Sequence, residues 1–219
     1  MTFFLFILFS TLEYFSSLTL MLVLFRFSWK EHYLKFLVFS ILLSLISNTL
    51  IQQGLDSIAP LVQLLVFMFL VYVVLRVNLI NSMIMVFTTY FIFGLVQITI
   101  IMMFTYFGII ENVAVYEFSA FITQVASSFY MFLFAAIIYW RHGGFSFVDY
   151  KSNNKKLLLF NKANRIFFIV LIVVFVLFVS INMLYYNSSR PPYLLIALIF
   201  LFSLFALLYL AIRRDDGRV

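Results

Sequence analysis

The stretch from residue 3 to residue 30, FFLFILFSTLEYFSSLTLMLVLFRFSWK, decides the class of fold. Its apolar part, up to Phe25, exceeds the roughly 20 residues that a helix needs to cross the hydrocarbon core of a bilayer. It is too long for the core of a signal peptide, and no basic residue precedes it, so we expect it to remain as a membrane anchor. Arg26 and Lys30 follow it, and basic residues flanking a span mark its cytoplasmic end. The first span therefore predicts an outside N-terminus.

The same alternation of apolar runs and short polar gaps continues along all 219 residues. The predicted spans are residues 3–25, 34–51, 58–75, 79–107, 113–140, 166–186 and 193–212. Of the 14 Lys and Arg residues, only Arg190 falls in a gap that this arrangement places outside. The other basic residues fall in the alternate gaps, as expected for cytoplasmic loops. The sequence thus predicts an all-α, multi-pass bundle of seven spans in the cell membrane, with a cytoplasmic C-terminus.

The composition excludes several classes of protein. Hydrophobic residues make up 66% of the chain and charged residues 10%, whereas about a quarter of a soluble domain is charged. The net charge of +6 is explained by cytoplasmic loops facing anionic lipid headgroups, so we expect membrane lipid as a partner and no nucleic acid. Cysteine is absent, which rules out disulfides and thiolate sites. His32 and His142 have no neighbour at ligand spacing, so we expect no metal and no cofactor.

Glu13 is the one ionisable residue that this arrangement puts near the middle of the bilayer. It lies ten residues into the first span, which is roughly 15 Å at the helical rise. A carboxylate there costs about 2.5–3.5 kcal/mol on insertion scales, so it is expected to be protonated, hydrogen-bonded or exposed to a wet cavity. Two interpretations follow. Glu13 is a proton-sensitive or ligand-contacting group, or its carboxyl group joins the first span to an amide or hydroxyl on a neighbouring helix.

Amide side chains within the spans are the expected partners of Glu13. They are Asn48, Gln63, Gln97 and Gln124. Two spans also carry polar stripes at helical spacing, namely Ser40, Ser44, Ser47 and Asn48 in the second span, and Gln124, Ser127 and Ser128 in the fifth. Such stripes usually mark close helix packing with hydrogen bonds between helices. The alternative is a shared polar pocket in the outer half of the bundle.

The chain has a layout of seven Phe- and Leu-rich spans. This layout includes the stretch LFRF at 24–27, after the first span, and Ala59-Pro60-Leu61 at the start of the third. This layout resembles the N-terminal membrane regions of peptide-sensing, quorum-type receptor histidine kinases of Gram-positive bacteria. The chain departs from that family after residue 212, where no helical linker, phosphoacceptor histidine or ATP-binding motif follows. The resemblance therefore implies a stand-alone sensor or accessory subunit, or the membrane part of a longer protein.

Two functions compete at this point. The first is a non-enzymatic sensor or accessory signalling subunit of a bacterial membrane, which binds a peptide or lipid-like ligand and acts through a protein partner. Its outer-loop candidate is Arg190, and the candidates for its cytoplasmic partner surface are Arg141, Lys155, Lys156, Arg165, Arg213 and Arg214. The second is a small-molecule or proton-coupled transporter in which Glu13 couples the proton. No HExxH, GxSxG or Gly-rich phosphate loop indicates an enzyme.

Overall fold

The computed structural model describes residues 2–146 and 192–215, and between them residues 169, 170, 172, 173, 175–177, 179 and 180. The side chains of residues 213 and 214 lie outside this description. The helices are α1 (Thr2–Leu24), α2 (Trp29–Gln52), α3 (Ala59–Leu75), α4 (Leu79–Tyr106), α5 (Phe118–Trp140) and α7 (Tyr193–Asp215). Residues 169–180 are helical wherever they are described. The described part of the chain contains no strand.

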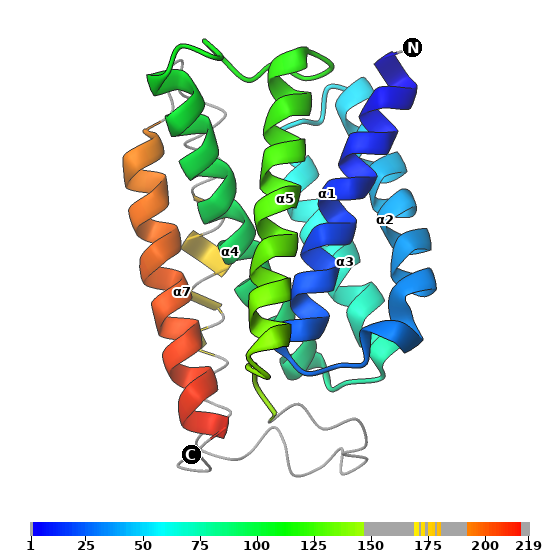
Figure 1. Cartoon of the computed structure of the whole chain (residues 1–219), viewed down its shortest axis with the longest axis vertical. Coiled ribbons are helices and arrows are strands. Elements are labelled where there is room, and N and C mark those ends of the chain that lie inside the picture. The colour runs from blue at the N-terminus through cyan, green and yellow to red at the C-terminus, as the bar shows by residue number, and fades with distance from the viewer. Residues whose placement is uncertain are drawn as a thin grey trace.

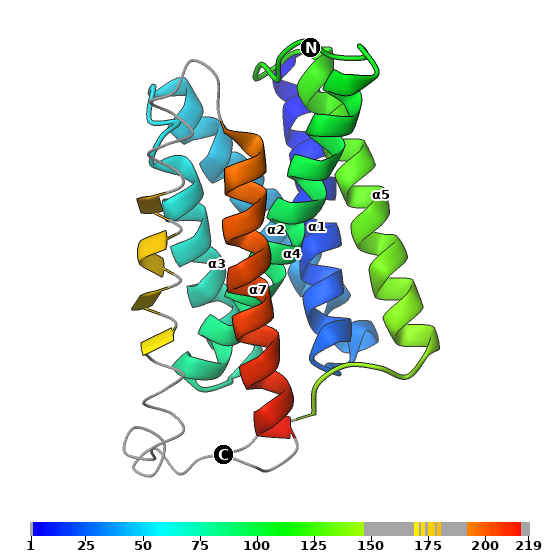
Figure 2. The same ribbon diagram turned by 90° about the vertical axis from the view of Figure 1, so that its left-hand side faces the viewer.

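The helices stand side by side in one bundle, in which α1 to α5 run alternately down and up and α7 runs in the same direction as α5 (Figure 1). The start of α1, the α2–α3 turn and the α4–α5 loop lie at one end, here called the N-terminal end. The α1–α2 turn and the last turns of α5 and α7 lie at the other, the C-terminal end, as Figure 2 also shows. Thus α5 and α7 both end at the C-terminal end of the bundle.

Five helices are long and apolar enough to cross a membrane, by length and composition. They are α1, α2, α4, α5 and residues 193–212 of α7, and α3 is a shorter apolar helix of 17 residues. At 1.5 Å per residue, α3 is about 26 Å long, slightly less than the hydrocarbon thickness, whereas the 28 residues of α4 reach about 42 Å. A bundle of such helices identifies the chain as a membrane protein.

Helix boundaries depart from the sequence-based prediction at three places. The fifth helix begins at Phe118 and not at residue 113, because Tyr116 has a φ of 65°, which an α-helix does not tolerate. The second helix begins earlier, at Trp29, since nothing in the polar segment 29–33 prevents helix formation. The last helix continues to Asp215, beyond the apolar part of the sequence. The predicted span 166–186 lies mostly outside the described residues.

Helix α1 occupies the interior of the bundle and packs against α2, α4 and α5. Small side chains on its neighbours allow this close approach. Ser40 and Ser44 of α2 and Ser127 of α5 are all fully buried. The Ser44 hydroxyl donates a hydrogen bond to the main-chain oxygen of Ile7 at 3.1 Å, which joins α2 to α1 directly. Ser40, Ser44 and Ser127 of the two stripes therefore serve helix packing, as small residues commonly do in membrane bundles, whereas Ser47 lines a cavity.

The half of the bundle toward the C-terminal end is filled mainly by apolar side chains. Leu18 and Met21 of α1 and Ile84, Met85 and Phe91 of α4 are 0–1% exposed. They belong to one continuous cluster that also includes Leu64, Val71 and Leu75 of α3. Buried polar groups of α1, in contrast, are Ser10, Glu13, Ser16 and Ser17, all before this cluster. Toward the C-terminal end the interior is mainly apolar, with a few buried polar side chains such as Asn81, Ser82 and Thr88 of α4.

The chain after α5 is hydrogen-bonded to the α1–α2 turn. Arg26 donates from Nη2 to the main-chain oxygen of His142 at 3.1 Å and from Nε to that of Gly143 at 3.3 Å. The main-chain N–H of Phe145 donates to the oxygen of Leu24 at 2.7 Å. Gly144 has a φ of 102°, and a Cβ at this position would lie 2.7 Å from the same Leu24 oxygen. Glycine is therefore required where the two segments meet.

Candidate functional site

Glu13 lies in the middle of α1 with its side chain 92% buried, since its exposed fraction is 8%. Both carboxyl oxygens accept hydrogen bonds from neighbouring helices. Gln97 of α4 donates from Nε2 to Oε1 at 3.2 Å, and Gln124 of α5 donates from Nε2 to Oε2 at 3.2 Å. The Ser127 hydroxyl also donates to Oε1, at 3.5 Å. The carboxyl group thus joins three helices.

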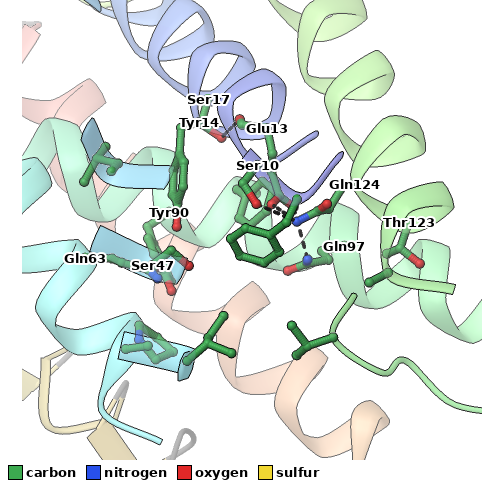
Figure 3. A pocket seen from close by; sticks show the side chains of 18 of the residues that line it. Ser10, Glu13, Tyr14, Ser17, Ser47, Gln63, Tyr90, Gln97, Thr123 and Gln124 are labelled. Carbon is green, nitrogen blue, oxygen red and sulfur yellow. Dashed lines mark hydrogen bonds between the residues drawn. The ribbon is translucent and has the colours of Figure 1, made fainter. Parts of the chain in front are cut away.

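Gln97 and Gln124 bring N–H donors to Glu13, whereas the hydroxyl of Ser127, which has a single proton, also lies 3.0 Å from the main-chain oxygen of Gln124. Gln124 additionally donates to the hydroxyl of Ser10, one turn before Glu13, at 3.1 Å. Figure 3 shows Ser10, Glu13, Gln97 and Gln124 together on one side of the site. Hydrogen bonds and access to a cavity offset much of the cost of a carboxylate at this depth.

A cavity of about 270 Å³ adjoins this cluster. It is bounded by α1–α5, and it extends to the N-terminal end of the bundle, where Asp56, Val113 and Val115 line it. Tyr14, Ser47, Gln63 and Tyr90 line the side opposite Gln97 and Gln124 (Figure 3). Glu13 and Asp56 are the only charged residues among the described residues that line the cavity. The site is therefore a partly polar, acidic cavity that begins at one end of the bundle.

The α4–α5 loop is held over this end by Tyr116. The Tyr116 hydroxyl donates to Oδ1 of Asn48 at 2.9 Å, and its ring lies 5.1 Å from the ring of Phe6, centroid to centroid. Burial raises the pKa of Tyr116, and the negative charge of Asp56 raises it further. The phenol therefore stays protonated at neutral pH and keeps its role as a donor.

The four amides that sequence analysis singled out occupy three different situations. Gln97 and Gln124 hydrogen-bond to Glu13. Gln63 lines the cavity from α3, and none of the hydrogen bonds to Glu13 among the described residues comes from it. Asn48 is 4% exposed and accepts the hydrogen bond of Tyr116 outside the cavity lining.

Sequence reasoning did not single out Asp56, Tyr90 or Ser10 as site residues. Ser10 had a usable signal, because it lies three residues before Glu13 and Ser17 lies four residues after it, so all three share one helical face. Tyr90 likewise lies seven residues before Gln97 on one face of α4. Asp56 had no such signal, since only the packing of α2 and α3 brings their connecting turn to the cavity.

The remaining candidates belong to the ends of the bundle. Arg141 directly follows α5 and is exposed at the C-terminal end. Arg190, Lys155, Lys156 and Arg165 lie outside the described residues, as do the side chains of Arg213 and Arg214. His32 is 2% exposed, and its Nδ1 lies 2.8 Å from the main-chain oxygen of Ser28.

Among residues 2–146 and the other described positions, no group of three His, Cys, Asp or Glu side chains could hold a metal ion. Comparison with known proteins adds no assignment. No family model, no curated protein and no solved structure matches the chain. Any statement about function therefore depends on the geometry of the site.

Proposed function

We propose that the chain is a non-enzymatic receptor or sensor subunit of a bacterial cell membrane, which binds a small ligand, or the end of a peptide, in the cavity beside Glu13. The observation that carries this proposal is a cavity that extends from Glu13 to one end of the bundle and is closed at its base by an apolar core. No catalytic group or cofactor is required for this role. Membrane lipid and a protein partner complete the system.

The proposal includes seven spans, with the N-terminal end of the bundle outside the cell. Two observations support it. The basic residues of the α1–α2 turn, Arg76 and Arg141 all lie toward the C-terminal end, as expected for the cytoplasmic side. In addition, α5 ends at the C-terminal end whereas α7 begins at the other, and residues 169–180 between them are helical wherever they are described. In this orientation the cavity opens to the outside.

The closed base of the cavity favours a receptor over a transporter. Transport requires a path to the other side, and below Glu13 the side chains of Leu18, Met21, Met85 and Phe91 are 0–1% exposed. Interiors of this kind are close-packed, and opening them requires helices to move apart. No glycine interrupts α1, and the described helices are unbroken, unlike the discontinuous helices of many transporters. The proton-coupled transporter with Glu13 as its coupling group is thus the weaker candidate.

A route from the ligand site to the cytoplasm runs along α1. Glu13 lies in the middle of α1. At the end of α1, the main-chain oxygen of Leu24 accepts a hydrogen bond from the N–H of Phe145. Arg26, just after α1, donates to the main-chain oxygens of His142 and Gly143. The main-chain N–H and the hydroxyl of Ser146 both bond to Asp215 at the end of α7, at 2.9 Å and 2.7 Å. A shift of α1 would therefore move a surface made by the ends of three helices, where a partner would read it.

We expect the cavity to be reachable by water from outside the cell. The chain has no cysteine, so single cysteines can be labelled with membrane-impermeant maleimide without background. Gln63→Cys in the cavity wall and Asn112→Cys in the α4–α5 loop are expected to react in intact cells, because both lie at the proposed outer end. Glu31→Cys, exposed near the start of α2, is expected to react only after the membrane is opened. Labelling of Glu31→Cys, but not of Gln63→Cys, in intact cells would overturn the proposed orientation.

A sensor without an enzymatic part needs a partner, so purification in mild detergent is expected to retain a second protein at constant stoichiometry. Arg141→Glu places the opposite charge on the exposed end of α5 and is expected to reduce the amount of this partner several-fold. Lys35→Glu makes the same charge change at the same end, on α2, and serves as the control. Repeated recovery of the protein alone would contradict the role as an accessory or sensor subunit.

A further inference from the structure

We propose that the cavity beside Glu13 recognises the primary ammonium group of a small organic cation. This inference rests on the proposed function and names the class of its ligand. It follows from three properties of the cavity wall, namely its charge, its unused hydrogen-bonding atoms and its aromatic rings.

The charge of the wall has one sign. Glu13 lies at the base of the cavity and Asp56 in the turn at its N-terminal end, and neither Lys nor Arg is among its described lining residues. Clefts lined by one sign of charge within low-dielectric walls concentrate ions of the opposite sign. An anionic ligand would meet two carboxyl groups and no counter-charge. The cavity is therefore selective for cations.

Two lining residues carry a buried acceptor oxygen that is unpaired within the described part of the chain. Oε1 of Gln124 and Oδ1 of Asp56 are buried and have no hydrogen-bond partner among the described residues. Gln124 already donates through its nitrogen to Glu13 and Ser10, so the oxygen is the unpaired half of its amide. A primary ammonium group carries three N–H donors and no acceptor, which complements such a site. A quaternary ammonium group would leave these oxygens unpaired.

The aromatic part of the wall suits the carbon skeleton of an organic cation. The rings of Tyr14, Tyr90 and Phe93 line the cavity, and aromatic faces attract a nearby cation. The volume of about 270 Å³ lies just under the range of roughly 300–1,000 Å³ typical of sites for drug-sized ligands. The described residues contain no cluster suited to a metal ion. The ligand is accordingly a small free amine, or the amino group of a peptide inserted from the end of the bundle.

The charge preference can be measured at Gln63→Cys with two methanethiosulfonate reagents of similar size, one bearing a trimethylammonium group and one a sulfonate. The ratio of their rates, divided by the same ratio for free mercaptoethanol, is expected to favour the cation about tenfold or more. Glu13→Gln and Asp56→Asn, each added to Gln63→Cys, are expected to reduce this preference. Glu111→Gln removes an exposed carboxyl group outside the lining and is expected to leave the ratio unchanged.

Ligand binding itself is tested by protection of Gln63→Cys against a neutral maleimide. The protonated probe 2-phenylethylamine is expected to slow labelling, whereas 2-phenylethanol and 3-phenylpropionate, of similar shape but neutral or anionic, are not. Protection by Phe-Gly-Gly and not by its N-acetylated form would identify the amino terminus of a peptide as the source. Protection by 2-phenylethylamine alone would identify a free amine.

The outcomes separate the two levels of the proposal. If Gln63→Cys reacts with both charged reagents equally, and neither Glu13→Gln nor Asp56→Asn changes the ratio, the cavity is open but the ammonium inference is overturned. Equal protection by the amine and its neutral analogue has the same meaning. If Gln63→Cys reacts with no reagent from outside while Asn112→Cys does, the cavity is closed to water, and both the proposed function and this inference fail.

Discussion

Glu13→Lys is expected to lower the free energy of unfolding by about 3–5 kcal/mol, the cost of leaving an uncompensated charge in a buried site. The carboxyl oxygens of Glu13 accept from Gln97, Gln124 and Ser127. The ammonium group of a Lys side chain would place its N–H donors against the donors of these three residues. The carboxylate that could neutralise its charge would be gone. Glu13→Gln keeps the shape of the side chain and one acceptor oxygen, so its effect on stability is expected to be smaller.

The measurement is the midpoint of thermal unfolding in mild detergent. Glu111→Lys is the matched control, because it makes the same change of charge on an exposed side chain in the loop between α4 and α5. Surface substitutions of this kind usually alter stability by less than about 0.5 kcal/mol. Equal midpoints for Glu13→Lys and Glu111→Lys would show that Glu13 is not held among buried donors.

Gly94→Ala is expected to cost about 1–3 kcal/mol by overpacking the contact between α4 and α7. A Cβ on Gly94 would overlap the ring of Phe200, lying 2.6 Å from its Cδ2. The ring has little room to turn, since Phe200 is 6% exposed and packs edge-on against Phe91 with centroids 5.1 Å apart. Glycine at this position is thus a requirement of helix packing.

A double-mutant cycle tests this explanation. Phe200→Leu alone is expected to destabilise the bundle, but Gly94→Ala should cost much less in the Phe200→Leu background than in the natural chain. Gly143→Ala is a suitable control, because its Cβ would meet no atom closer than 3.5 Å. Additive effects of Gly94→Ala and Phe200→Leu would contradict a direct steric contact.

The sequence predicted the helical class and most helix bounds because apolar length and flanking charge are local properties of the chain. It was wrong at the start of α5, because the apolar residues Val113 and Val115 resemble the beginning of a span. The turn at Tyr116 depends on contacts with Asn48 and Phe6, which are distant in sequence. The seven spans and their orientation stay predictions.

The candidate site was predictable only in part. Amides within apolar spans are few, so a list of four included both amides that contact Glu13. The sequence could not separate Gln97 from Asn48, because the rotation of each helix about its own axis is set by packing. Asp56 was out of reach for the same reason. The cavity exists only once five helices and two connections are assembled.

The uneven filling of the bundle has an electrical consequence for the proposed receptor. Water in the outer cavity would carry the external potential inward nearly to Glu13, and the membrane voltage would then fall across the apolar half around Leu18, Met85 and Phe91. Moving one charge through the whole potential is worth about 2.3 kcal/mol per 100 mV. A cation reaching Glu13 from outside would cross little of it. The occupancy of the site would therefore follow the ligand concentration outside the cell and would depend little on the membrane potential.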